Sequence, residues 1–349
     1  MALSPALVSA QPLAPALAEG LRADTGAPGV VVGYVSATER ELAVTGVRRR
    51  GDPAPVTEAD LWHLGSITKS MTALLVARLV AAGEVSWDDS IGTVLGAQIP
   101  DLHPGYAPVT YMDLLQHRAG LVANVPLAVT RSLVGLDRDV MADRLTYARA
   151  VLTEAPLDAP FTYSNAGYVV VGAMLEARTG QSWEALMRAH VFAPLGLTSA
   201  GFGAPGEAET LSQPRGHVRR WGRLRPVEPG PAADNIAALG PAGTVHMSAA
   251  DLLAYLGVHL ARAPKVLPAE AWDRLHVPPP GSDYAAGWAQ MPSGGLVHTG
   301  SNTMWYVLTV VRFDPPQVLV IGANSGDIKT LDPAAAEAAR GLLEALEGP

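Results

Sequence analysis

The chain has 349 residues, of which 48% are hydrophobic and 17% charged. This composition excludes a disordered chain, and the length suggests about two domains with a large buried core. Lys and Arg number 25 against 33 Asp and Glu, a formal net charge of −8, so neither a nucleic acid nor an anionic membrane is expected as a partner. No apolar run reaches the ~18 residues of a membrane-spanning helix, and the absence of cysteine excludes disulfides, thiolate nucleophiles and zinc–cysteine sites.

The first ten residues, MALSPALVSA, are small and apolar and end in a pattern typical of a signal-peptide cleavage site, but no Lys or Arg precedes that pattern. Two interpretations of residues 1–10 therefore stay open. They are the remnant of a secretion signal, which would place the protein in the periplasm or outside the cell, or they are the disordered start of a cytoplasmic protein.

In chain order, the hydrophobic periodicity first predicts a helix and then two strands, over residues 12–24, 30–35 and 41–47. A short strand-like segment at 61–64 precedes a mainly helical middle, whose helices are expected at 67–82, 111–117, 138–154, 165–178, 183–190 and 249–262. Residues 201–243 are rich in Pro and Gly and are expected to be irregular or to form short strands. Three further strands follow, at 296–299, 304–313 and 317–323, and Asp332-Pro333 is expected to open a final helix, since proline suits the first helical position.

This order of elements predicts an α+β fold, in which strands from both ends of the chain join in one antiparallel sheet flanked by the N- and C-terminal helices. The mainly helical middle is then an inserted second domain. We expect the discontinuous sheet domain to comprise residues 11–66 and 285–349, and the helical domain residues 67–284. A cleft between two such domains is the usual place for a binding or catalytic site.

The sharpest candidate for chemistry is Gly65-Ser66-Ile67-Thr68-Lys69, where a strand-like segment meets a helix. Residues three apart on a helix share a face, so Lys69 can approach the Ser66 hydroxyl. A serine is a weak nucleophile unless a neighbouring base takes its proton. The alternative interpretation is an N-capping serine beside a solvated lysine.

Two later segments could complete such a site. Tyr163-Ser164-Asn165 begins a predicted helix; a tyrosine acts as a base only beside a positive charge such as that of Lys69, and Asn165 could position a substrate amide or the lysine. His298-Thr299-Gly300-Ser301 ends a predicted strand, where a glycine leaves room for a substrate backbone. Taken singly, these segments also fit a helix cap beside a partly buried tyrosine and a strand that runs into a turn.

Together, and in this order, the three segments resemble the Ser-x-x-Lys, Tyr-x-Asn and Lys-Thr-Gly motifs of the penicillin-recognising serine hydrolases. They are most similar to the class C β-lactamase branch, which includes D-peptidases and β-lactamase-like esterases. Other similar stretches are Leu114–Leu121, Phe192–Leu197 and Leu239–Met247. The resemblance runs from about residue 13 to the C-terminus and implies a β-lactamase/transpeptidase-like fold.

The resemblance also implies a role for each matching residue. Ser66 would attack a carbonyl and become acylated. Lys69 would hold Tyr163 in a basic state, and Tyr163 would take the serine proton and later activate water. The backbone N–H groups of Ser66 and Ser301 would form an oxyanion hole, and Asn165 would orient Lys69 and the substrate amide.

One residue departs from the family pattern, since His298 stands where the third motif usually has lysine. Histidine is mostly neutral at pH 7, so a substrate carboxylate should be held less well. Family members with aminopeptidase or esterase activity also replace this lysine. The resemblance therefore implies acyl-enzyme hydrolysis of a short ester or a D-amino-acid peptide, less favourably of a β-lactam, with no metal or organic cofactor. The alternative is a catalytically silent binding or sensor module on the same fold.

Some other patterns point less strongly to function. Gly201–Gly206 fits a GxGxxG dinucleotide template, but no strand precedes it and a proline interrupts it. No histidine pair has the helical spacing of metal ligands. His117 is expected at the end of a helix, where its charge would favour the helix dipole. Trp288 and Trp305 flank the third motif and could line an acyl pocket.

Overall fold

A computed structural model describes residues 12–135, 138–230 and 232–347, so the expectation for residues 1–10 falls outside the described residues. Strands from the two ends of the chain form one six-stranded antiparallel sheet in the order β2-β1-β11-β10-β9-β8. These strands are β1 (Gly29–Val35), β2 (Arg40–Gly46), β8 (Ala289–Met291), β9 (Gly295–Gly300), β10 (Tyr306–Arg312) and β11 (Gln317–Ala323). Val32 of β1 lies opposite Ile321 of β11, which confirms that the N- and C-terminal strands are neighbours.

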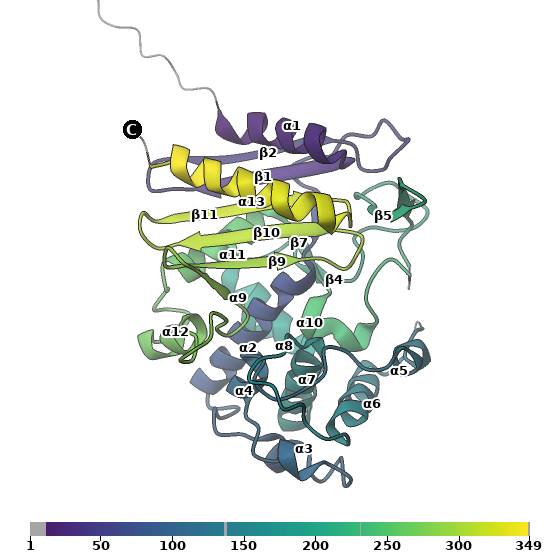
Figure 1. The fold of residues 1–349 in the computed structure, drawn as a ribbon, viewed down its shortest axis with the longest axis vertical. Coiled ribbons are helices and arrows are strands. Elements are labelled where there is room, and N and C mark those ends of the chain that lie inside the picture. Colours follow the sequence, from purple (N-terminus) through teal and green to yellow (C-terminus); the bar gives the residue numbers. More distant parts are fainter. Residues whose placement is uncertain (1–11, 136–137, 231, 348–349) are drawn as a thin grey trace, which may run out of the picture.

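Helices cover both faces of this sheet. α1 (Leu13–Thr25) and α13 (Ile328–Ala345) lie together on one face (Figure 1), and α11 (Ala249–Leu260) packs against β1, β10 and β11. Because the central strands are buried on both sides, β1 is a continuous apolar run rather than an alternating one. α11 lies within residues 67–284, where the sequence predicts the helical domain, but it packs against the sheet.

The last helix begins earlier than the sequence predicted. α13 starts at Ile328, and Pro333 lies inside it rather than at its first position. The carbonyl of Asp327 accepts hydrogen bonds from the N–H groups of Thr330 and Leu331, and the Asp327 carboxylate accepts one from the Thr330 hydroxyl. This carboxylate at the N-terminus supports an extra turn before the proline.

The remaining helices form the helical layer, in which α2 (Thr68–Ala81) is buried along most of its length and packs against α4, α7, α8, α10 and α12. They are α3 (Ile91–Leu95), α4 (Tyr111–Leu115), α5 (Leu127–Ser132), α6 (Val140–Leu152), α7 (Asn165–Thr179), α8 (Trp183–Met187), α9 (Ala193–Leu195), α10 (Gly240–Gly243) and α12 (Ala269–His276). Thr110 caps α4 in a capping box with Asp113, as its position before that helix predicted. Within the described residues, no helix is both long and apolar enough to cross a bilayer.

Short elements join the two layers. A three-stranded sheet contains β3 (Leu61–His63), β7 (Val245–Ser248) and β4 (Gly201–Phe202), and a separate hairpin contains β5 (Gly216–Arg220) and β6 (Arg223–Val227). The 3-10 turns are η1 (Gly65–Ile67), η2 (Pro104–Tyr106) and η4 (Ala237–Leu239), and a π-helical turn, η3 (Arg188–Phe192), follows α8. The Pro/Gly-rich part of the chain thus forms the short strands and turns that its composition predicted.

Two glycines allow the end of β9 to lie directly against the turn that carries Ser66. Gly65 has φ +50°, and a side chain there would collide with the backbone of Ser301. A side chain on Gly300 would collide with the carbonyl oxygen of Leu64 and would lie 3.0 Å from the Ser66 nitrogen. Contact at this distance between two backbones requires glycine, so the turn and the strand end are held as one rigid unit.

We therefore expect Gly300→Ala to lower the free energy of unfolding by roughly 1–3 kcal/mol, because the added methyl group must push β9 away from η1. The measurement is urea unfolding followed by circular dichroism. Gly341→Ala is the matched control, since Gly341 lies in α13 with no heavy atom within 4 Å of the position of an added Cβ. That control should stabilise the protein by about 0.5–1 kcal/mol. Equal unfolding midpoints for Gly300→Ala and the wild-type protein would contradict the close contact.

Candidate active site

Ser66 lies in η1, directly after β3 and before α2. The strand is held in place at its end, where the Leu64 N–H donates to the Val245 carbonyl at 2.8 Å. α2 continues from the turn, so Lys69 follows Ser66 by three residues and its Nζ lies 3.0 Å from the Ser66 Oγ. The local spacing that the sequence suggested is therefore present as a direct contact.

Lys69 is fully buried, and its amine is surrounded by oxygen atoms that carry no charge. Besides Ser66, Nζ contacts Asn165 Oδ1 and the Ala242 carbonyl, each at 2.8 Å. The two latter atoms are acceptors only, so they take two N–H groups of a neutral amine and leave its lone pair for the Ser66 hydroxyl. Burial without a carboxylate lowers the pKa of Lys69 to about 7.

Tyr163 reaches Ser66 from the loop before α7. It exposes 37% of its surface and shares a pocket wall with Ser66. Burial raises the pKa of Tyr163 to about 12, although the interaction of the phenol with Ser66 acts in the lowering direction, and the ammonium position of Lys69 lies 4.9 Å from the centroid of the tyrosine ring. Burial therefore disfavours the charged form of each side chain, and Lys69 is the one of the two that titrates near neutral pH.

The start of α7 places Tyr163 and Asn165 on either side of a helix cap. Ser164 caps the helix by accepting from the Gly167 N–H at 3.0 Å, and its own hydroxyl donates to the Val122 carbonyl at 2.6 Å. The side-chain nitrogen of Asn165 donates to Asn124 Oδ1 at 2.9 Å, which turns the Asn165 oxygen toward Lys69. In this segment Ser164 is the capping residue, and its neighbours Tyr163 and Asn165 lie beside Ser66 and Lys69.

His117 belongs to the site, although the sequence suggested only a helix end for it. It follows α4 with φ 60°, an unusual conformation for a residue with a side chain, and its Nδ1 accepts from the Ser164 N–H at 3.0 Å. Its ring centroid lies 4.4 Å from that of Tyr163. Burial, and then the charge of Lys69, lower the pKa of His117 to about 2, so the expected interaction of a charged imidazole with the helix dipole is wrong.

His298 lies on β9, and both of its ring nitrogens are occupied. Nδ1 is 2.6 Å from the Thr299 carbonyl, to which it donates, and Nε2 is 2.9 Å from the Tyr284 hydroxyl, from which it accepts. Burial, and then the charge of Lys69, lower the pKa of His298 to about 4. A neutral imidazole thus occupies the position of the usual lysine. No sequence signal marked Tyr284, because only tertiary packing brings it to β9.

Ser301 follows β9 and is the last of the six predicted site residues. Its backbone nitrogen lies beside Gly65, next to the Ser66 nitrogen, so both N–H groups belong to one small region of backbone. A pocket of about 430 Å³ opens there, lined by Ser66, Tyr163, Tyr284, Ala289, Val297, His298, Thr299 and Ser301. The structure therefore brings all six predicted site residues together, four of them on the pocket wall and two, Lys69 and Asn165, behind it.

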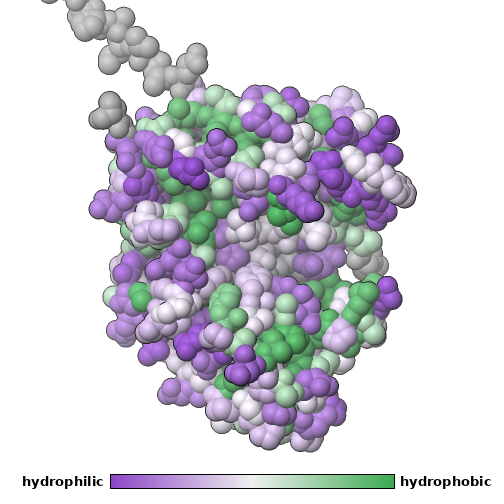
Figure 2. Space-filling view, viewed as in Figure 1, coloured by the Kyte–Doolittle hydropathy of each residue, from purple (hydrophilic) through white to green (hydrophobic). Residues whose placement is uncertain are grey.

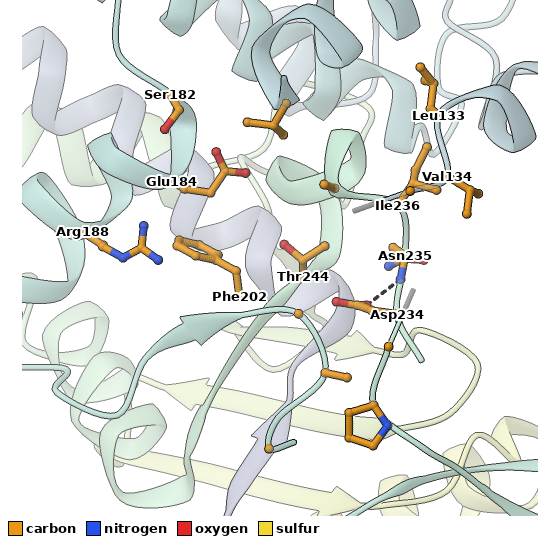
Figure 3. A pocket seen from close by; sticks show the side chains of 18 residues that line it. Leu133, Val134, Ser182, Glu184, Arg188, Phe202, Asp234, Asn235, Ile236 and Thr244 are labelled. Atoms are coloured by element: carbon orange, nitrogen blue, oxygen red, sulfur yellow. Dashed lines mark hydrogen bonds between the residues drawn. The ribbon is translucent and has the colours of Figure 1, made fainter. Parts of the chain in front are cut away.

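A larger cavity of about 550 Å³ has Asp234 on its wall (Figure 3), and hydrogen bonds connect this residue to the site. Oδ1 of Asp234 accepts from Asn302 at 3.1 Å and lies 2.7 Å from Nε2 of the buried His63. His63 Nδ1 in turn accepts from the Gly65 N–H at 3.1 Å. The Asp234 carboxylate therefore contacts Asn302, which follows Ser301, and His63, which binds the N–H of Gly65 just before Ser66. It thus supports both backbone segments that carry the N–H groups of Ser66 and Ser301.

The weaker sequence patterns do not form sites in the described residues. Gly201–Gly206 makes β4 and a bend with no helix after it, which a dinucleotide-binding turn would need. No group of three or more His, Asp or Glu side chains in this part of the chain could hold a metal ion. Trp288 and Trp305 are buried, at 0% and 1% exposure, and belong to the core rather than to the wall of the pocket.

A family model described as Beta-lactamase matches residues 14–344, so the chain belongs to the β-lactamase family. Penicillin-binding protein 4 of Amycolatopsis lactamdurans is 32% identical over 245 residues, which cover 69% of this chain and 62% of that protein. Esterase EstB of Burkholderia gladioli is 35% identical over 167 residues, which cover 45% of this chain and 42% of the esterase. The chain thus spans less than two thirds of the length of these relatives.

Solved structures show the same architecture. The crystal structure of SurE superposes with a TM-score of 0.75 at 25% identity, covering 93% of this chain and 75% of that one. D-amino acid amidase from Ochrobactrum anthropi SV3 gives a TM-score of 0.76 at 21% identity, covering 95% and 97%. At that identity the amidase comparison concerns the fold alone, and the fold is the β-lactamase/transpeptidase-like one that the sequence motifs implied.

Because the pKa of Lys69 is about 7, while those of His298 and Tyr163 are about 4 and about 12, we expect one ascending limb near pH 7 in kcat/KM for an ester substrate. The rate should rise as Lys69 loses its proton. The measurement is initial rates from pH 5 to 9 in buffers of constant ionic strength. A profile that falls across pH 7 would contradict a neutral lysine as the reactive form.

The same pKa affects stability. Lys69 has its ordinary pKa of 10.5 in the unfolded chain, which therefore holds one more proton than the folded chain between pH 7 and 10. Stability from this residue should rise with pH across that window and be lowest below it. Accordingly, the urea concentration at the unfolding midpoint of the wild-type protein, relative to that of Lys69→Met, should increase from pH 7 to 10. A constant difference would argue against a depressed pKa.

Proposed function

We propose that the chain is a serine hydrolase that forms an acyl-enzyme on Ser66 and hydrolyses it with water. The observation that carries this proposal is the contact between the buried Lys69 amine and the Ser66 hydroxyl at 3.0 Å, with two carbonyl oxygens on the other side of the amine. An activated serine needs a base that is unprotonated at neutral pH, and burial supplies one here.

In acylation, the Lys69 amine takes the proton of the Ser66 hydroxyl while the serine oxygen bonds to the substrate carbonyl carbon. The developing oxyanion accepts hydrogen bonds from the N–H groups of Ser66 and Ser301, which lie together at the end of β9. When the tetrahedral intermediate collapses, the bond to the leaving group breaks. The Tyr163 hydroxyl, within reach of Ser66, donates a proton to the leaving group and regains one from the Lys69 ammonium.

Deacylation follows the same path with water in place of the leaving group. The water loses a proton through Tyr163 to Lys69, its oxygen bonds to the acyl carbon, and the Ser66 oxygen leaves and is reprotonated. His117 packs against Tyr163 and stays neutral, so it positions the phenol without competing for the proton. Asn165 holds the amine in line throughout.

The pocket favours substrates without a carboxylate. Its wall contains no charged side chain, because the nitrogens of His298 are bound to Thr299 and Tyr284 and the imidazole is neutral. We therefore propose short esters and amides, including D-amino-acid amides, as substrates, with penicillins and peptides with a free carboxylate less favoured. An esterase among the relatives supports this choice.

A fluorophosphonate probe should add its mass to the native protein, and Ser66→Ala should abolish that addition. Tyr163→Phe should be folded and labelled but turn over an ester at least about 100-fold more slowly, the typical contribution of a general acid or base. Intact-mass spectrometry and p-nitrophenyl butyrate hydrolysis are the measurements. Labelling that persists in Ser66→Ala would refute the nucleophile, and no labelling or turnover of any ester or amide would favour a silent binding module.

Cleavage of p-nitrophenyl butyrate should be fast, and cleavage of nitrocefin, which carries a carboxylate, slow. His298→Lys should raise kcat/KM for nitrocefin relative to the ester by at least about tenfold, because a charged donor can then bind the carboxylate. His298→Gln is the control, since it is polar but uncharged and should give no such gain. A wild-type preference for nitrocefin would show that a neutral pocket does not exclude carboxylates.

A further inference from the structure

The hairpin of β5 and β6 ends in a turn that is costly to form. The two turn residues, Trp221 and Gly222, both have positive φ, at 48° and 73°, as in the tightest hairpin turns. Glycine adopts this conformation readily, but a bulky side chain rarely does. Trp221 is also 92% exposed, so its side chain gains nothing from packing that could offset the strain.

The arginines of this hairpin lie close together, although their like charges repel one another. Its sequence, GHVRRWGRLRPV, contains four arginines and no acidic residue. Arg220 lies directly opposite Arg223, and Arg225 lies opposite Val218, so these three arginines share one face of the two-stranded ribbon. Like charges directly opposite each other destabilise a strand pair. Leu224, on the other face, is buried against the protein. Val218 and Val227, at the base of the arginine face, pack against the core, so only the tip of that face, with its three exposed arginines, points outward.

Neighbouring acidic groups do not neutralise that face. Arg219, on the inner face, donates from Nε to Asp327 at 2.9 Å and so ties the hairpin to the start of α13. Among the described residues, Arg220, Arg223 and Arg225 form no ion pair, and all three are exposed. The part of the molecular surface around β5 is mainly hydrophilic in the view of Figure 2.

The base of the hairpin is anchored to the sheet. The His217 N–H donates to the Met304 carbonyl at 2.9 Å, and His217 Nδ1 lies 2.7 Å from the Asn324 carbonyl. The Gly326 N–H donates to the His217 carbonyl at 2.9 Å. The tip is thus presented on a fixed support beside the main sheet, where β5 lies in Figure 1.

We propose that this hairpin tip, defined as residues 219–225, docks on a membrane surface that contains anionic phospholipids. Guanidinium groups bind phosphate in a bidentate manner, and tryptophan is enriched where an apolar layer meets water. A lipid headgroup layer offers both environments at once, and bound phosphates would relieve the Arg220–Arg223 repulsion. A protein with a net charge of −8 would be repelled as a whole, so contact through one projecting basic tip is the arrangement that the charges allow.

This surface is independent of the proposed catalysis and refines the expectation drawn from net charge. Composition averages the charge over the whole chain, whereas the pairing of β5 with β6 gathers three unpaired arginines on one face. Attraction to a lipid surface acts over about a Debye length, so the charges within that distance of the surface contribute most to binding.

The test is flotation of the full chain with vesicles of phosphatidylcholine alone and of phosphatidylcholine with about 30% phosphatidylglycerol, at low and at high salt. Binding should require phosphatidylglycerol and weaken with salt. Arg220→Gln/Arg223→Gln should weaken partitioning about 30-fold, from a contribution of about fivefold for each arginine near an anionic surface. Arg131→Gln/Arg340→Gln is the matched control, with the same change of charge at exposed arginines of α5 and α13, and should bind as the wild type does.

Tryptophan fluorescence gives a second readout. Five of the other tryptophans are buried and Trp87 is half-buried, so quenching by brominated phosphatidylcholine in the anionic vesicles should come from Trp221 and disappear in Trp221→Phe. Equal binding to both vesicle types, or equal loss in the control variant, would overturn the proposal. Binding to heparin or DNA through the same arginines, without flotation on anionic vesicles, would also overturn it and assign the tip to a soluble polyanion.

Discussion

The burial of Lys69 among uncharged oxygen atoms is the constraint on which the rest of the site depends. α2 is covered along most of its length, and the amine at its start contacts a hydroxyl, an amide oxygen and a backbone carbonyl, with two uncharged tyrosine rings nearby. Removing a charge from water without a counter-charge favours the neutral form, so the lysine becomes a base near neutral pH. Any residual positive charge on Lys69 also disfavours protonation of His117 and His298, which keeps the whole pocket close to neutral.

That chemistry requires three distant segments to meet within a few ångströms, and the sheet makes this geometry possible. β1 comes from the start of the chain and β9 to β11 from its end, and η1, which follows β3, packs against β9 and β10 of this sheet. Gly65 and Gly300 then allow the two backbones to touch. Asp234 and His63 hold the same junction from the opposite side, so the region around the two N–H groups is supported by side chains as well as by the main chain.

Charge is distributed unevenly in this protein, and each proposed function depends on the charge of its own part of the surface. The chain as a whole is acidic, the pocket wall is uncharged, and the β5–β6 hairpin is strongly basic. An uncharged pocket suits neutral substrates, and a projecting basic tip suits an anionic surface. If both proposals hold, one molecule would bind to an anionic surface and hydrolyse neutral esters or amides. Each part can be removed by substitution without touching the other.

Local patterns in the amino-acid sequence are enough to predict the order of the main strands and helices and the approach of Lys69 to Ser66, and from that order the joining of both chain ends in one sheet. All of these depend on local periodicity or on spacing within one helical turn. Packing between distant segments, by contrast, brings Tyr284 to His298 and His117 to Tyr163, and α13 begins before Pro333 against the sequence pattern. Packing also lowers the pKa of Lys69 and places Arg220 opposite Arg223. Desolvation and cross-strand pairing both depend on contacts between residues that are not neighbours in the sequence.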